Sequence, residues 1–217
     1  ANQYYIHQMR HYVAHLLRCQ PDLMGTLPPE VRPQAFQELE EWSARIPHRE
    51  LVRVCLGLVQ EAAQDIEMVL PLAYDVLRTM VTLPGEWDLD DALALTISDC
   101  PLDHPGSRDE MILALDELLQ RGLIVAGKEA LRFVVPFPVR FCLKEREVFG
   151  PVDREALRDR VAEYFSAKAI EEEKLDPTFR GSWRLTNLLH GFKSSVEWLE
   201  EARGESLQLA GQVEERS

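Results

Sequence analysis

The chain has 217 residues, of which 46% are hydrophobic and 28% charged, and its 24 Lys and Arg against 37 Asp and Glu give a formal net charge of −13. This composition excludes a mainly disordered chain, and apolar runs of only a few residues exclude a membrane-spanning helix. The acidic excess is found in residues 1–68, 69–149 and 150–217 alike, which disfavours nucleic acid as a partner because phosphate contacts need basic charge.

The cysteines and the first residues bear on the origin of the chain. Cys19, Cys55, Cys100 and Cys142 form no CxxC pair, which predicts reduced thiols in a cytoplasmic protein. The first ten residues carry neither a secretory signal nor an initiator methionine. We therefore expect a fragment cut from a longer chain, with no contact to a membrane.

Residues 1–68 predict a small helical domain. Apolar residues recur at three- and four-residue steps from Gln3 to Arg18, over 36–46 and over 51–66, which is typical of amphipathic helices. Prolines at positions 21, 33 and 47 separate the three segments. A helical bundle is the expected arrangement.

Residues 69–149 predict a winged-helix domain, which is three helices followed by a small β-hairpin. The first helix is expected over 72–83, Asp88 can cap the second, and Ser107 with Glu110 forms a capping box for the third. Gly122 has the position of a left-handed C-cap. Two β-rich runs follow, and alternation along the second predicts that Phe133 faces the core.

Residues 150–217 return to helical periodicity, over about 152–170 and again over 183–202. Two adjacent amphipathic segments predict a C-terminal helical hairpin. The expected fold class is therefore mainly α, with a helical bundle, a winged helix and a helical hairpin in chain order.

Catalytic motifs are missing from the sequence. It contains no GxxxxGK[ST] or GxGxxG loop, no GxSxG elbow, no HExxH helix and no SxxK pair. We expect no enzymatic activity, no catalytic residue and no cofactor, although a catalytic site defined only by geometry stays open as an alternative. Three acidic pairs on predicted helices are expected to face solvent: Asp90-Asp91, Asp109-Glu110 and Asp116-Glu117.

Three histidines, His7, His11 and His15, stand at successive turns of the first predicted helix, opposite its apolar stripe. His15 is rotated by roughly 80° from His7 over eight residues, so the three cannot converge on one ion. We expect an exposed histidine face without bound metal. A metal site is the alternative.

The third helix of a winged helix enters the major groove when the domain binds DNA, and there it presents basic and amide side chains. Here that helix carries four carboxylates, so protein contact is favoured and a DNA-binding transcriptional regulator is the alternative. The candidate interaction surface combines the basic residues of this region with the histidines: Arg108, Arg121, Lys128, Arg132, Arg140, His7, His11 and His15.

Two segments resemble the STAND group of AAA+-like signal-transduction ATPases. Residues 2–8 (NQYYIHQ) are similar to the start of the lid helix, where a short Gly-x-Pro-Tyr-like turn leads into an apolar helix. Residues 118–124 (LLQRGLI) and 131–140 (LRFVVPFPVR) resemble the winged helix of those proteins, in which the third helix ends at Gly and an Arg opens the helix after the wing.

The resemblance implies a role for each segment. In STAND proteins the lid and winged helix follow the nucleotide-binding core and pack against it to hold the inactive state, and helical TPR-like sensor repeats come next. Residues 1–68 would then be lid-like, and residues 150–217 would begin a sensor. Some members carry a nucleotide-contacting Met-His-Asp element where this chain has Val135-Pro136-Phe137. The implied function is a non-enzymatic regulatory and protein-interaction module, whose partner is another protein or the remainder of its own longer chain.

Overall fold

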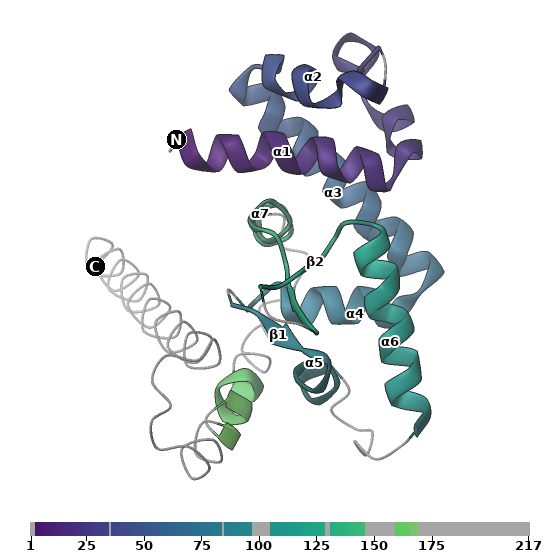
Figure 1. Cartoon of the computed structure of the whole chain (residues 1–217), viewed down its shortest axis with the longest axis vertical. Helices are drawn as coiled ribbons and strands as arrows, with labels where there is room; N and C mark the ends of the chain where they lie inside the picture. Colours follow the sequence, from purple (N-terminus) through teal and green to yellow (C-terminus); the bar gives the residue numbers. More distant parts are fainter. Residues whose placement is uncertain are drawn as a thin grey trace, which may run out of the picture. The chain divides into compact units, whose positions relative to one another are not determined.

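The computed structural model describes residues 3–34, 36–83, 85–96, 105–128, 131–145, 159–165 and 167–168. The described part is mainly helical and contains a small antiparallel sheet of three strands (Figure 1). This confirms the mainly α fold class. Residues 159–165 and 167–168 are helical, and the rest of the predicted C-terminal hairpin lies outside the described residues. None of the described helices has the length and apolar character needed to cross a membrane.

The longest of the described helices is α3. In chain order the helices are α1 (Gln3–Cys19), α2 (Leu39–Arg45), α3 (His48–Val69), α4 (Pro71–Met80), α5 (Leu89–Thr96), α6 (Pro105–Gln120) and α7 (Phe137–Glu145), and the strands are β1 (Trp87–Asp88), β2 (Val125–Ala126) and β3 (Arg132–Val134). Three short 3-10 segments, Pro21–Thr26, Pro29–Val31 and Phe36–Glu38, connect α1 to α2.

The chain divides into two compact units, residues 1–82 with 86–150 and residues 83–85 with 151–217. Within the first unit α3 packs against α1 and also against α4 and α7. Elements of the predicted lid-like and winged-helix regions therefore share one core around α3. The predicted domain boundaries at 68/69 and 149/150 stay predictions.

The predicted apolar stripes of α1 and α3 are confirmed as the centre of this core. Because residues three and four apart share a helix face, both stripes are buried, except at Tyr5 of the predicted α1 stripe, which is 43% exposed. The buried residues are Ile6, Met9, Tyr12, Val13, Leu16 and Leu17 on α1 and Leu51, Val54, Cys55, Leu58, Val59, Ala62 and Ile66 on α3. Cys55 also meets Cys142 of α7, with the two thiol sulfurs 3.7 Å apart and both residues buried, so these cysteines are reduced core residues.

The start of α5 is fixed by two aspartates that cap each other. Asp88 Oδ1 accepts a hydrogen bond from the backbone N–H of Asp91, and Asp91 Oδ2 accepts one from the N–H of Asp88, both at 2.9 Å. The predicted cap at Asp88 is confirmed. The expectation that Asp91 faces solvent is wrong: Asp91 is fully buried, because its carboxylate replaces water in satisfying the backbone N–H of Asp88, directly before α5.

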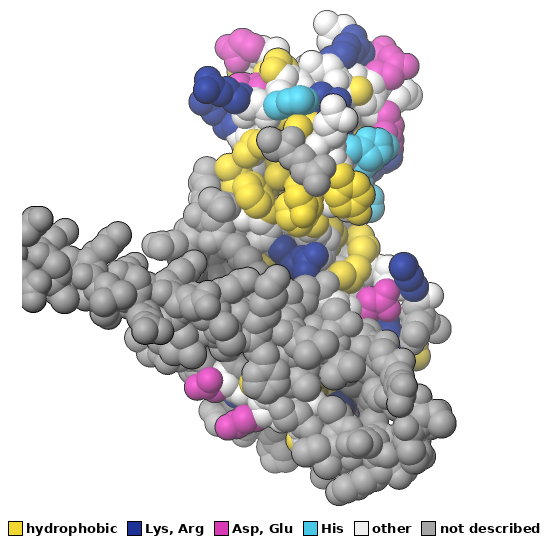
Figure 2. Space-filling model, turned by 90° about the vertical axis from the view of Figure 1, so that its left-hand side faces the viewer, with side chains coloured by type: hydrophobic (Ala, Val, Ile, Leu, Met, Phe, Trp, Pro, Cys, Tyr) yellow, Lys and Arg dark blue, Asp and Glu magenta, His cyan; other side chains and the backbone are white. Residues whose placement is uncertain are grey.

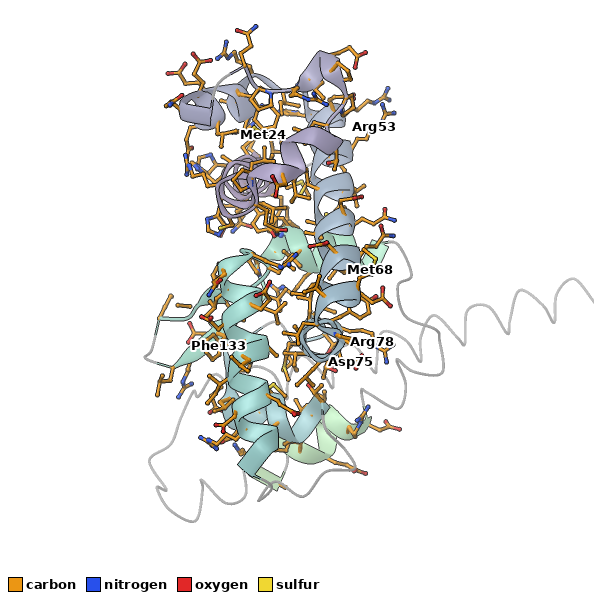
Figure 3. All side chains as sticks on the ribbon, turned by 90° about the vertical axis from the view of Figure 1, so that its right-hand side faces the viewer. Met24, Arg53, Met68, Asp75, Arg78 and Phe133 are labelled. Carbon is orange, nitrogen blue, oxygen red and sulfur yellow. The ribbon has the colours of Figure 1, made fainter. Side chains whose placement is uncertain are left out.

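The sheet has the strand order β1-β3-β2, with Trp87 opposite Phe133 and Val125 opposite Val134. Trp87 is fully buried, and its ring centroid lies 5.4 Å from that of Phe133. Phe133, labelled in Figure 3, is only half-buried, so the expectation that it fills the core is wrong. Strands of two and three residues are too short to cover both faces of an aromatic ring.

Candidate interaction surface

The outward face of α6 combines carboxylates with apolar side chains. The opposite face packs against α4 and α5 and buries Met111, Ala114, Leu115 and Leu118. The remaining positions include Ile112 and Leu113, which are 48% and 64% exposed, and the exposed carboxylates Asp109, Glu110 and Asp116. The acidic character predicted for this helix is confirmed. Its spacing predicted a buried Ile112, which is wrong, and the exposure of Leu113 was not predicted.

Arg108 of α6 and Arg121, directly after α6, are both paired with carboxylates. The Arg108 guanidinium lies 3.0 Å from a carboxylate oxygen of Asp90. Arg121 donates to Asp65 of α3 and, at 2.6 Å, to Glu117, and only 17% of its side chain is exposed. Burial acts to lower the pKa of Arg121, but these carboxylates outweigh burial and raise it. Arg121 therefore ties α6 to α3.

The other three basic candidates lie on different elements. Lys128 is exposed in the turn after β2, where its backbone N–H donates to the Glu86 carboxylate at 2.8 Å. Arg132 on β3 and Arg140 on α7 are half-buried, and burial lowers the pKa of Arg140. Of the five predicted basic residues, Arg108 and Lys128 are the exposed ones.

The end of α6 meets the end of α1 around Gly122, and we call this contact the joint. Gly122 has a φ of 70°, which confirms the predicted left-handed C-cap. The N–H of Leu123 donates to the carbonyl of Leu118, and the N–H of Gly122 donates to that of Leu119, which is the Schellman pattern. Tyr12 of α1 and Gln20, directly after α1, satisfy two further carbonyls: Tyr12 Oη donates to Gly122 O at 3.1 Å and Gln20 Nε2 to Arg121 O at 2.7 Å.

His15 belongs to this joint. A Cβ atom at Gly122 would lie 3.0 Å from both His15 Nε2 and Cys19 Sγ, so the glycine is required for the close approach of α1. Burial, and then the charge of Arg18, lowers the pKa of His15. The expectation of three exposed histidines is therefore wrong for His15, which is half-buried because Gly122, directly after α6, lies against its turn of α1.

The remaining histidines of α1 face outward and contact each other. His7 Nε2 and His11 Nε2 are 2.9 Å apart, and His11 Nδ1 lies 3.3 Å from the carboxylate of Glu40 on α2. Glu40 also accepts a hydrogen bond from Arg18 at 2.9 Å. That hydrogen bond is the main reason why the pKa of Glu40 is lowered. The contribution of Glu40 was missed because nothing in the sequence places α2 beside α1.

A second exposed apolar area lies on the first turns of α1 and α7. Tyr4 and Tyr5 are 61% and 43% exposed, and the Tyr5 ring stacks on Phe137 at a centroid distance of 4.6 Å. Figure 2 shows hydrophobic side chains gathered on this side of the molecule, close to histidines. We name Tyr4, Tyr5 and Phe137 the aromatic patch.

Comparison with known protein families, with curated proteins and with solved structures found no match to this chain.

Proposed function

We propose that this chain is a non-enzymatic regulatory module that binds protein through a winged helix. The order α4, β1, α5, α6, β2 and β3, with β3 between the other two strands, supports the winged-helix assignment for its central part. In this assignment α6 is the third helix, whose outward face would contact a partner.

The outward face of α6 is the observation that carries the proposal. Phosphate groups would be repelled by Asp109, Glu110 and Asp116, and these three exposed carboxylates outnumber the exposed donor side chains of the helix, Arg108 and Gln120. Ile112 and Leu113 instead give it an apolar centre surrounded by charge, the composition of a protein-binding patch. Protein is therefore favoured over DNA.

The resemblance to STAND-type ATPases extends this proposal to the nature of the partner. By that analogy residues 1–68 act as a lid, residues 150–217 begin a TPR-like sensor, and the partner is the remainder of a longer chain or a second protein. The aromatic patch, on the first turn of the lid-like helix α1, supports a second contact of the same kind.

Site-specific photo-crosslinking in the producing cells tests the proposal. A photoreactive phenylalanine analogue at Leu113 is expected to give a discrete protein adduct, whereas the same analogue at Leu131, which is 85% exposed beside β3, is the matched control and is expected to give none. Equal adducts at both positions, or none at Leu113, would contradict the proposed surface.

A DNA gel shift tests the alternative function. At about 50 mM salt, where phosphate contacts are strong, we expect no submicromolar binding to mixed-sequence duplexes. A shift that disappears when Arg108 and Lys128 are changed to Glu would favour a DNA-binding regulator instead.

A further inference from the structure

His7 and His11 lie one turn apart on the exposed side of α1, and their imidazole rings face each other. The ring centroids are 4.2 Å apart with an interplanar angle of 84°, and the two Nε2 atoms are separated by 2.9 Å. We propose that these two nitrogens form a chelate for a divalent first-row transition-metal ion such as Zn²⁺. This site is independent of the proposed protein-binding role of α6.

The separation of the two nitrogens matches that of two ligands on one ion. Zinc–imidazole bonds of about 2.0–2.1 Å, at bond angles between roughly 90° and 110°, place the two nitrogens about 2.8–3.4 Å apart. The observed 2.9 Å lies in this range, so a shared ion can replace the hydrogen bond between the two nitrogens once both rings turn toward it and the His7 proton moves from Nε2 to Nδ1. Neutral imidazole is a preferred ligand of zinc, copper and nickel.

Glu40 orients one of the two ligands from outside the site. An ionised carboxylate only accepts hydrogen bonds, so the His11 Nδ1 that faces it carries the proton and leaves the lone pair of Nε2 directed toward His7. Arg18 holds the same carboxylate at 2.9 Å. A histidine whose second nitrogen is held by a carboxylate is the usual arrangement in protein zinc sites.

The remaining coordination positions are open. Among the described residues no group of three His, Cys, Asp or Glu side chains could hold a metal ion, and His15 is turned into the joint with Gly122. Water fills these positions in the isolated chain, so the ion exchanges readily and is removed by dialysis. The proposal takes up the metal site that the sequence left as the alternative, with two histidine ligands instead of three.

Calorimetric titration of the chelator-treated chain with ZnCl₂ tests the proposal. We expect saturable binding of one ion per chain, weakened at least tenfold by His7→Ala and by His11→Ala, because each variant removes one of two ligands. Glu40→Gln is expected to weaken binding about tenfold, the effect of losing an orienting carboxylate. His48→Ala is the matched control, since His48 is also exposed and borders the same 480 Å³ pocket as His7, and it should bind like the parent.

Several outcomes would overturn the proposal. These are the absence of saturable binding by the parent, binding that survives both His7→Ala and His11→Ala, or an equal loss in His48→Ala. If Glu40→Gln binds like the parent while the two ligand variants fail, the chelate is supported and the orienting role of Glu40 is overturned. Far-UV circular dichroism of each variant checks that α1 is intact, which is expected because alanine favours helix.

Discussion

The two ends of α6 differ in what surrounds them. At the C-terminal end Tyr12 of α1, Gln20 directly after α1 and Asp65 of α3 satisfy polar groups of Arg121 and Gly122, so charge and polarity are used inside the molecule. Toward the other end Arg108 is exposed, and at the centre Ile112 and Leu113 are exposed between carboxylates. One helix therefore has an end that its neighbours fix and a face that they leave exposed, and Arg121 and Arg108 differ only in these surroundings.

The largest expected effect is at the joint. Gly122→Ala places a side chain at a φ of 70°, which costs about 1–2 kcal/mol, and the new Cβ would press on His15 and Cys19 at 3.0 Å. We expect a loss of about 2–4 kcal/mol in the free energy of unfolding. Gly57→Ala is the matched control, since nothing lies within 4 Å of its added Cβ on the exposed side of α3, and it should stabilise the chain by about 0.5–1 kcal/mol. Urea unfolding measures both changes in the free energy of unfolding. If the two changes have the same sign, α1 does not lie close to Gly122.

Tyr12→Phe should have the next largest effect. It removes the buried hydrogen bond to the Gly122 carbonyl, and we expect a loss of about 1–2 kcal/mol. Burial, followed by the nearby thiols of Cys55 and Cys142, raises the pKa of Tyr12 well above 10.0.

The raised pKa of Tyr12 also gives a test with pH. The folded state holds the phenol neutral, so this stabilisation is present below pH 10 and is lost as the pH rises through the pKa of the folded chain. The stability of the parent should fall more steeply above about pH 10 than that of Tyr12→Phe. Urea titrations at alkaline pH measure both chains. If the free energies of unfolding of the parent and of Tyr12→Phe fall in parallel with pH, the Tyr12 hydroxyl is not buried.

Arg121→Gln and Arg108→Gln compare the two arginines directly. Arg121 is largely buried between Asp65 and Glu117, so its replacement should lower the free energy of unfolding by about 1 kcal/mol. We expect no larger effect because Asp65 is 48% exposed and solvent screens its charge. The exposed pair of Arg108 with Asp90 should contribute less than about 0.5 kcal/mol. Thermal melts at low and high salt check the order, and a larger loss at Arg108 would reverse the comparison.

The smallest effect is expected on the outward face of α6. Leu113→Ser, like Ile112→Ser, should change stability by no more than about 0.5 kcal/mol, because both side chains are already exposed. Both variants should retain the melting temperature of the parent. A loss above about 1.5 kcal/mol would show that this face is part of the folded core, and the proposed surface would fail with it.

Local patterns predicted the features whose causes lie within a few residues. The three- and four-residue spacing gave the buried faces of α1 and α3, and the Gly122 C-cap followed from a glycine at the end of a periodic helix. The capping role of Asp88 belongs to the same group. Each of these depends on backbone geometry that neighbouring residues determine.

The features that were missed depend on residues far apart in the chain. Tyr12 reaches a carbonyl at position 122, and Arg121 reaches Asp65, contacts that no helical period encodes. His15 was assigned to the exposed face because the period of α1 could not reveal that Gly122 lies against its turn. Of the candidate interaction surface, the sequence indicated the acidic helix but not its exposed apolar centre at Ile112 and Leu113.

The continuity of α3 has a mechanical consequence. Its 22 residues form one uninterrupted helix, which rises about 33 Å and contacts α1, α4 and α7. Because no break interrupts α3, the elements packed against it share one continuous support. The first non-helical backbone after α3 is at Leu70, where φ is −145° and ψ is 82°, immediately before α4 begins. The backbone angles of Leu70 therefore set the angle between α3 and α4.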